Sequence, residues 1–220
     1  MQELGAFARN EKAGRTVQAP QEALAALRAD PALARALDAA GPPVVRRREG
    51  GYPGLFRIVV EQQLSVESAR AILARCEARL PVITPDAVLA ASEEELRACG
   101  LSRPKIRYLR AVAAAVEDGT LDLKALPALP DEEAAARLTA VTGVGPWTAA
   151  IYMLFCEGRA DVWPRGDVAL LAAYAAASGF AVKPPQRDFD DAAVRFAPYR
   201  GVAAHTLWTY YAHLKGRQPG

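Results

Sequence analysis

The sequence lacks several features that would place the protein in a specialised class. No apolar run approaches the length of about 18 residues that suggests a membrane span, and the first 15 residues contain no long apolar segment of the signal-peptide kind. The three cysteines, Cys76, Cys99 and Cys156, form no close pair, which suits a reducing compartment and buried thiols. These absences predict a cytoplasmic protein without a membrane partner.

A strong charge of one sign and metal-binding patterns are missing as well. The net charge is only +2, so a nucleic-acid surface would have to arise from local asymmetry. His205 and His213 have no cysteine or carboxylate at ligand spacing, which argues against zinc. Three cysteines are too few for a four-cysteine iron–sulfur cluster, and the Gly-Lys-Ser/Thr of a phosphate-binding loop does not occur. We therefore predict no metal centre.

The pattern that is present is helical. No segment shows sustained alternation with β-branched residues, and no repeat of about 20–50 residues appears. The segment after Ser102 carries Ile106, Leu109, Ala113 and Val116 at helical spacing. Polar capping residues precede several such segments: Asp30, Ser65, Thr84, Ser92 and Ser102. The sequence predicts an all-α fold, with small helices in its first 50 residues.

Residues 131–178 are the most informative stretch, because they predict two helices joined by a Gly-Val-Gly hairpin. Gly143, Val144 and Gly145 interrupt the pattern, and the second helix should end at Gly158. The amides of the three hairpin residues are expected to be unpaired beside a helix N-terminus, where they could bind a phosphate. A tight turn between two packed helices is the alternative.

One carboxylate, Asp167, follows a Pro-Arg-Gly loop and precedes an apolar helix. The structural interpretation is an N-cap, since aspartate is favoured there. The functional interpretation is a fixed negative charge that stabilises a developing cation and orients or deprotonates water. Both roles are compatible. Asp161 lies before the Pro164 turn and is interpreted as a surface residue.

Four stretches resemble the helix-hairpin-helix DNA glycosylases and follow one another along the chain in the order of that family. Among these enzymes they are most similar to the AlkA type, which removes alkylated bases such as 3-methyladenine. Gly143, Gly145, Trp147, Thr148 and Ala149 match the hairpin pattern, and Pro164 and Asp167 match its Pro-x-x-Asp. The other matching stretches are VEQQLS from Val60, LRACGLSRPKIRYL from Leu96 and PYRGVAAHTLW from Pro198. The resemblance covers roughly residues 50–215.

The resemblance implies an all-α HhH-GPD glycosylase fold with two helical lobes and a cleft between them. Residues 51–160 would form the lobe with the hairpin. Residues 1–50 and 161–220 would form the second lobe, which carries Asp167. Too few residues precede Pro53 for the N-terminal sheet domain of some members. The implied partner is double-stranded DNA with alkylated bases, bound by a monomer that would be nucleoid-associated in a bacterium.

The resemblance also assigns roles to individual residues. Asp167 would be the catalytic residue. DNA would be bound by Gly143, Val144, Gly145, Thr148, Gln63 and Leu64, the last two as candidates to fill the gap left by a flipped base. The base pocket would be lined by Trp147, Trp208, Ile151 and Trp163. Aromatic faces suit stacked bases, core packing is the alternative for each aromatic, and Ile151 stands where some relatives carry tyrosine.

The segment from Thr142 to Gly179 contains no lysine, whereas relatives with lyase activity carry an amine nucleophile near the hairpin. The sequence therefore predicts a monofunctional hydrolase of base excision repair that uses water. It needs no cofactor, apart from a monovalent cation that the resemblance implies at the hairpin. The alternatives are a non-catalytic helix-hairpin-helix DNA-binding protein and a helical interaction protein without a nucleic-acid role.

Overall fold

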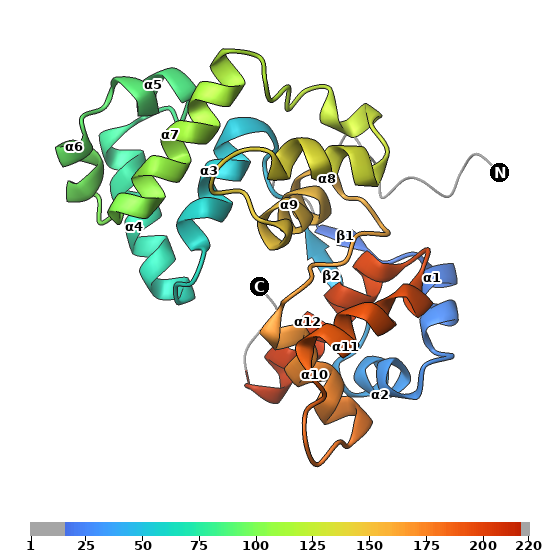
Figure 1. Cartoon of the computed structure of the whole chain (residues 1–220). Helices are drawn as coiled ribbons and strands as arrows, with labels where there is room; N and C mark the ends of the chain where they lie inside the picture. The colour runs from blue at the N-terminus through green and yellow to red at the C-terminus, as the bar shows by residue number, and fades with distance from the viewer. Residues whose placement is uncertain (1–15, 217–220) are drawn as a thin grey trace. The chain divides into compact units, whose positions relative to one another are not determined.

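The protein is described here by a computed structural model of residues 16–216, in which the chain folds into two compact units (Figure 1). One unit, the hairpin unit, comprises Glu49–Tyr152. The other, the loop unit, combines residues up to Arg48 with those from Met153 onward. The sequence-based lobes change at 51 and 160, whereas the second change here falls at 152/153, within the helical segment after the hairpin.

Helices make up nearly all regular structure in residues 16–216, which confirms the predicted all-α class. The hairpin unit contains α3 (Gly51–Glu61), α4 (Val66–Arg79), α5 (Pro85–Ala90), α6 (Glu93–Ala98), α7 (Arg103–Glu117), η1 (Leu126–Ala128), α8 (Asp131–Thr139) and α9 (Pro146–Tyr152). The loop unit contains β1 (Thr16–Gln18), α1 (Gln21–Leu27), α2 (Pro31–Ala40), β2 (Val44–Arg46), η2 (Met153–Glu157), α10 (Val168–Ser178), α11 (Gln186–Ala192), η3 (Ala193–Phe196) and α12 (Arg200–Leu214).

A short ribbon corrects the prediction of helices alone in the first 50 residues. Strands β1 and β2 pair antiparallel, with Val17 opposite Val45. Threonine and valine favour extended backbone, but each strand has only three residues. A run that short carries no readable period-2 signal, since the pattern needs about four residues or more.

The hairpin unit is built around α3 and α7. Helices α3, α5 and α6 pack on α7, while α4 and α9 pack on α3 and α8 packs on α9 (Figure 1). The side chains that are almost fully buried in this unit include Leu55, Phe56, Ile58, Leu96, Leu109, Leu138 and Tyr152. Their burial supplies the main driving force for folding this unit, at about 25 cal/mol per Å² of apolar surface.

Local capping starts the helices where the sequence predicts. Ser92 and Glu95 form a reciprocal capping box at α6, in which the Ser92 hydroxyl accepts from the Glu95 amide and the Glu95 carboxylate accepts from the Ser92 amide. The other predicted caps also accept from helix amides: Asp30, Ser65, Thr84 and Ser102. These contacts span at most one helical turn, which is why the sequence alone shows them.

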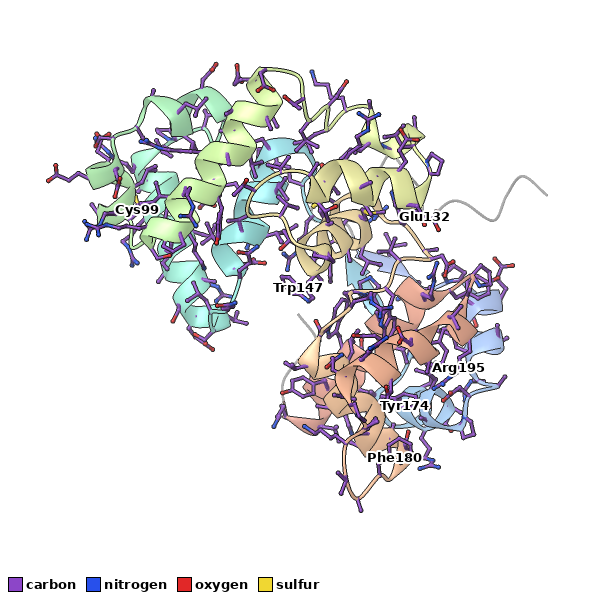
Figure 2. All side chains as sticks on the ribbon, viewed as in Figure 1. Cys99, Glu132, Trp147, Tyr174, Phe180 and Arg195 are labelled. Atoms are coloured by element: carbon purple, nitrogen blue, oxygen red, sulfur yellow. The ribbon has the colours of Figure 1, made fainter. Side chains whose placement is uncertain are left out.

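In the loop unit, α12 packs on both α2 and α10. Its core includes Leu33, Leu37, Leu170, Ala203 and Leu207. Tyr174 packs against this core, and its hydroxyl donates to Asp30 at 3.2 Å and accepts from Arg195 at 2.6 Å. Tyr174 and Arg195 are labelled in Figure 2.

The cysteines follow the prediction of buried thiols in two of three cases. Cys76 and Cys99 are buried, and Cys156 is half-buried. Burial, reinforced by the neighbouring Cys99, raises the pKa of Cys76 to about 12, so this thiol stays protonated at neutral pH. None of the helices in residues 16–216 is long and apolar enough to cross a bilayer.

Candidate active site and nucleic-acid interface

The loop that carries Asp167 is a tight turn. The Asp167 amide donates to the Pro164 carbonyl at 3.3 Å, and the Arg165 amide donates to the Trp163 carbonyl at 3.0 Å. Gly166 adopts φ +82°, the left-handed region that glycine enters without strain. An i to i+3 hydrogen bond with glycine at the third position is the pattern of a type II turn, which sets the direction in which α10 leaves the loop.

Asp167 caps α10, so the structural role predicted for it is confirmed. Its Oδ1 accepts from the amides of Ala169 at 2.9 Å and Leu170 at 3.0 Å. The side chain is half-buried, while the next residue, Val168, is exposed. Two amide donors at the positive end of a helix hold the carboxylate group in a fixed position. This geometry is compatible with the catalytic role, which remains a prediction.

Trp163 lies in the core of the loop unit, as the alternative interpretation of the aromatics expects. Only 8% of its surface is exposed, and its ring meets Phe189 edge to face at a centroid distance of 5.4 Å. Its indole N–H donates to Asp190 Oδ1 at 2.9 Å. This burial among core aromatics favours a structural role over the base-pocket role predicted from the resemblance.

Asp161 has a defined structural partner, which corrects its interpretation as a plain surface residue. Its carboxylate accepts from the Arg200 amide at 3.0 Å and from the Arg200 guanidinium at 2.9 and 3.0 Å. These contacts hold the start of α12. A carboxylate already engaged by a bidentate arginine is a poor candidate for chemistry.

The hairpin has the glycine geometry that the sequence predicts, but not the full set of unpaired amides. The Val144 amide donates to the Val141 carbonyl at 3.0 Å, and the Val144 side chain is buried. The expectation of three unpaired amides is therefore wrong for Val144, because the hairpin closes through its own backbone. For Gly143 and Gly145, no acceptor of the amide N–H lies within residues 16–216.

The two hairpin glycines differ in what they require. Gly143 has φ +93°, and a Cβ placed on it would lie 2.3 Å from the Cβ and Cγ atoms of Tyr108. Glycine is needed there for both backbone and space. Gly145 has no positive φ and no atom within 4 Å of such a Cβ. Gly145 is itself exposed.

Gln62 links the hairpin to the turn between α3 and α4. Its amide Nε2 donates to Thr148 Oγ1 at 2.7 Å and to the Gly143 carbonyl at 3.3 Å. The buried Thr148 side chain thus has a structural partner. Sequence reasoning missed Gln62, although its polar side chain at the end of an apolar helix was a usable signal.

The turn that follows Gln62 holds the two candidates for filling a base gap. Gln63 has φ +55°, the one non-glycine residue with positive φ in residues 16–216. Such backbone costs roughly 1–3 kcal/mol and persists where the surroundings enforce it. Gln63 and Leu64 are both exposed. The Lys105 ammonium group fixes the turn from the α7 side, donating to the carbonyls of Val60 at 2.5 Å and Gln62 at 2.8 Å.

The remaining base-pocket candidates differ in exposure. Trp147 lies on α9 directly after the hairpin and is half-buried (Figure 2). Ile151, one turn later on the same helix, is only 5% exposed, which favours core packing. Trp208 lies on α12 in the loop unit and is half-buried. Trp147 and Trp208 therefore keep accessible aromatic surface within their own units.

Trp208 belongs to an aromatic cluster that the sequence did not reveal. The Trp208 ring lies 5.6 Å from Phe155 and 5.4 Å from His205, centroid to centroid. The Arg48 guanidinium sits over the Phe155 ring at 4.8 Å, a cation–π arrangement. Burial, with the positive charges of Arg47 and Arg48, lowers the pKa of His205 to about 3, so the imidazole is neutral at physiological pH.

A π-helical turn leads out of α9 and positions Phe155. The sequence correctly predicts that the helical segment ends at Gly158, but its last five residues, η2, form a wider turn. The buried Arg47 guanidinium donates to the carbonyls of Leu154 and Glu157 at 3.3 and 3.2 Å. Such turns leave backbone carbonyls that need hydrogen-bond donors. Glycine at position 158 leaves room for the Arg47 guanidinium, because a Cβ there would overlap it.

Metal ligands do not gather in the described part of the chain: no group of three or more His, Cys, Asp or Glu side chains is close enough to hold an ion. The candidate groups that the structure describes are divided between the two units. The loop unit has the fixed carboxylate of Asp167 and the half-buried Trp208. The hairpin unit has the amides of Gly143 and Gly145, the positive-φ turn at Gln63 and the half-buried Trp147.

The chain is similar to known proteins in sequence and in fold. A DNA-3-methyladenine glycosylase 1 from Schizosaccharomyces pombe is 32% identical over 163 residues, which cover 71% of each chain. The crystal structure of a DNA-3-methyladenine glycosidase from Bacillus halodurans superposes with a TM-score of 0.79 at 30% identity, over 94% of this chain and 96% of that one.

A second solved structure adds a nucleic acid to the comparison. The 3-methyladenine DNA glycosylase of S. pombe, in complex with abasic DNA, superposes with a TM-score of 0.77 at 26% identity, covering 87% of this chain and 96% of that one. Residues 56–192, which include the hairpin and the Asp167 loop, match the HhH-GPD family model. The chain is therefore a member of the HhH-GPD superfamily of base excision DNA repair proteins.

Proposed function

We propose that the protein is a monofunctional DNA glycosylase that hydrolyses the N-glycosidic bond of alkylated bases, 3-methyladenine in type, in duplex DNA. The observation that carries the proposal is the carboxylate of Asp167, held at the N-terminus of α10 by the amides of Ala169 and Leu170. The named activities of the similar glycosylases support the same reaction.

In this proposal Asp167 supplies the electrostatic part of catalysis. Breaking an N-glycosidic bond leaves positive charge on the sugar, and a fixed carboxylate stabilises the oxocarbenium-like transition state. The same carboxylate can orient or deprotonate the attacking water. Since an alkylated purine carries positive charge, it is already a good leaving group. Strong acid assistance is then unnecessary.

The hairpin unit supplies the DNA contacts in this proposal. The amides of Gly143 and Gly145, which have no acceptor within residues 16–216, would bind a backbone phosphate, which positions the duplex without reading its sequence. Gln63 or Leu64 would fill the gap left by the flipped base. The enforced φ of Gln63 favours this residue, because strain is tolerated where a side chain must point in a fixed direction. The rings proposed to stack on the base are Trp147, on α9 of this unit, and Trp208, on α12 of the loop unit.

A monovalent cation at the hairpin is the one cofactor in this proposal. The carbonyls of Val141 and Gly143 each accept one hydrogen bond, from Val144 and Gln62, and each keeps a second lone pair. Such carbonyls can replace part of an ion's hydration shell. The bound ion would add positive charge beside the phosphate, while every step at the sugar uses groups of the protein itself.

A panel of synthetic duplexes tests the proposal and defines the substrate. Each duplex carries one lesion: 3-methyladenine or a stable analogue, 7-methylguanine, ethenoadenine or hypoxanthine. We expect release of the alkylated base and no release from undamaged DNA. A protein that binds these duplexes with salt-dependent affinity but releases no base would instead be a non-catalytic DNA-binding protein. A protein that binds none of them would be an interaction protein.

The product separates hydrolysis from lyase chemistry. A water nucleophile leaves an intact abasic strand that breaks only after alkali is added, and nothing is trapped by borohydride. A lyase would form a Schiff base through a lysine. The lysines nearest in sequence to the hairpin and loop are Lys124 and Lys183. A borohydride-trapped complex that disappears on changing either one to alanine would contradict the monofunctional assignment.

A further inference from the structure

Asp190, on α11, is a buried carboxylate that binds the loop carrying Asp167. Its side chain is 6% exposed, yet it is a carboxylate. Oδ1 accepts from the indole N–H of Trp163 at 2.9 Å. Oδ2 accepts from the Gly166 amide at 2.8 Å and from Gln186 Nε2 at 3.3 Å. Two of these three donors belong to the loop that ends at Asp167.

The two loop donors flank the turn. Trp163 precedes Pro164, and Gly166 directly precedes Asp167, so one carboxylate holds both ends of the segment that aims the catalytic candidate. The turn's own bonds, at 3.0 and 3.3 Å, fix its shape but not its position on the core. A buried carboxylate that loses a donor pays a large desolvation cost, so this arrangement resists movement.

We infer that Asp190 is a positioning residue, which fixes the Asp167 carboxylate for base release through Trp163 and Gly166. This inference rests on the proposed function. Catalytic groups must be held to within a fraction of an ångström, and a displacement of about 1 Å can cost about 100-fold in rate. The exposed neighbour Asp191 serves as a matched control, since it pairs with Arg165 of the same loop at 2.5 Å.

The Asp190→Asn substitution keeps the shape of the side chain and removes one acceptor oxygen. An amide accepts at its oxygen only, so its NH₂ group faces either Trp163 or Gly166, both of which are donors. We expect single-turnover base release at saturating enzyme to fall about 10- to 100-fold. Affinity for a duplex with a tetrahydrofuran abasic site should stay within about twofold, because the hairpin unit is untouched. Asp191→Asn should keep both quantities near wild type.

Nuclear magnetic resonance gives a readout that general destabilisation would not move selectively. The amide resonance of Gly166 and the indole N–H resonance of Trp163 should both shift in the Asp190→Asn protein and stay in place in the Asp191→Asn protein. Absence of these shifts would overturn the inference. Base release by folded Asp190→Asn protein at the wild-type rate would also overturn it, as would an equal loss in Asp191→Asn.

Trp163→Phe keeps the test decisive if Asp190→Asn does not fold. It retains an aromatic ring in the core and deletes only the indole donor, and we expect a smaller loss of rate at unchanged affinity. A full-rate Trp163→Phe protein would then overturn the inference. Wild-type protein that releases no base from any lesion duplex would overturn the proposed function itself, which separates the two failures.

Discussion

The loop that carries Asp167 and the Gly-Val-Gly hairpin are held in place by different means. The loop is tied to the core by a side chain from a distant helix, the buried carboxylate of Asp190. The hairpin closes through its own backbone, and Tyr108 packs against Gly143, which has no side chain. Its side-chain partner is the neutral amide of Gln62, which donates to the Gly143 carbonyl. A charged anchor suits a group that must point in one direction, whereas a bare backbone suits close approach to a phosphate.

We therefore expect the loop to lose its role in catalysis when a charge is removed. The hairpin should instead lose stability or DNA affinity when an atom is added. Removing charge at the loop should affect the chemical step and spare binding. Adding atoms at the hairpin should affect folding or binding, depending on which glycine is changed. The substitutions at Asp167, Gly143 and Gly145 test these differences.

Asp167→Asn should have the largest effect. It keeps the size of the side chain and an acceptor oxygen for the cap, but it removes the charge. We expect base release to fall at least ~10²-fold, the scale of one lost electrostatic stabiliser. Affinity for an abasic duplex should remain, because the phosphate contacts lie in the hairpin unit. Single-turnover kinetics and fluorescence anisotropy measure the two quantities, and near-normal base release would refute the assignment of Asp167.

Gly143→Ala should destabilise the protein, whereas Gly145→Ala should not. At Gly143 the left-handed backbone alone costs a non-glycine residue roughly 1–3 kcal/mol, and the added Cβ also collides with Tyr108. At Gly145 the added Cβ meets open space. Urea unfolding of the two variants measures the difference in the free energy of unfolding. Equal stabilities would show that Tyr108 moves aside and that the hairpin is not held as described.

Acid should destabilise the protein through His205. Its folded-state pKa, lowered to about 3, lies below the ordinary value of 6.5. Between these pH values His205 binds a proton in the unfolded chain but not in the folded chain. The free energy of unfolding therefore rises with pH across this window and falls as the pH is lowered. One such group contributes a slope of at most about 1.4 kcal/mol per pH unit.

Replacing the two histidines separately isolates the contribution of His205 to the pH dependence of stability. His205→Leu should flatten the dependence of the free energy of unfolding on pH between about 3 and 6.5. His213→Leu, at an exposed residue near the end of α12, is the control for replacing a histidine by leucine. Chemical unfolding at a series of pH values gives both slopes. Equal slopes in wild type and His205→Leu would place the acid sensitivity in other groups.

Gly145→Asp should produce the smallest of these effects, and only on binding. A carboxylate beside the proposed phosphate site should weaken binding to damaged and undamaged duplexes alike by about tenfold, equivalent to about 1.4 kcal/mol. The loss is uniform because a phosphate contact carries no base information. Gly145→Ala is the control for the added Cβ. Unchanged affinity in a folded Gly145→Asp protein would remove the hairpin from the DNA surface.

The sequence by itself determined the local features of both segments. It showed the glycine break at Gly143, the cap at Asp167 and the helix end at Gly158, and all three were confirmed. These features depend on residues within a turn or two of one another, where backbone preference and capping dominate. The all-α class followed from the helical spacing of apolar residues. The two three-residue strands were not predicted, because they are too short to show a period.

Only the tertiary structure decided which side chains support the site. Trp163 suited a base pocket in sequence, yet it is a core residue whose indole binds Asp190, 27 residues away. Gln62 binds Thr148 across 86 residues, and Arg47 binds Leu154 across 107. No local pattern encodes such pairs, because they form only when packing brings distant segments together. Burial then makes each unpaired polar group costly, which is why these partners are found in contact.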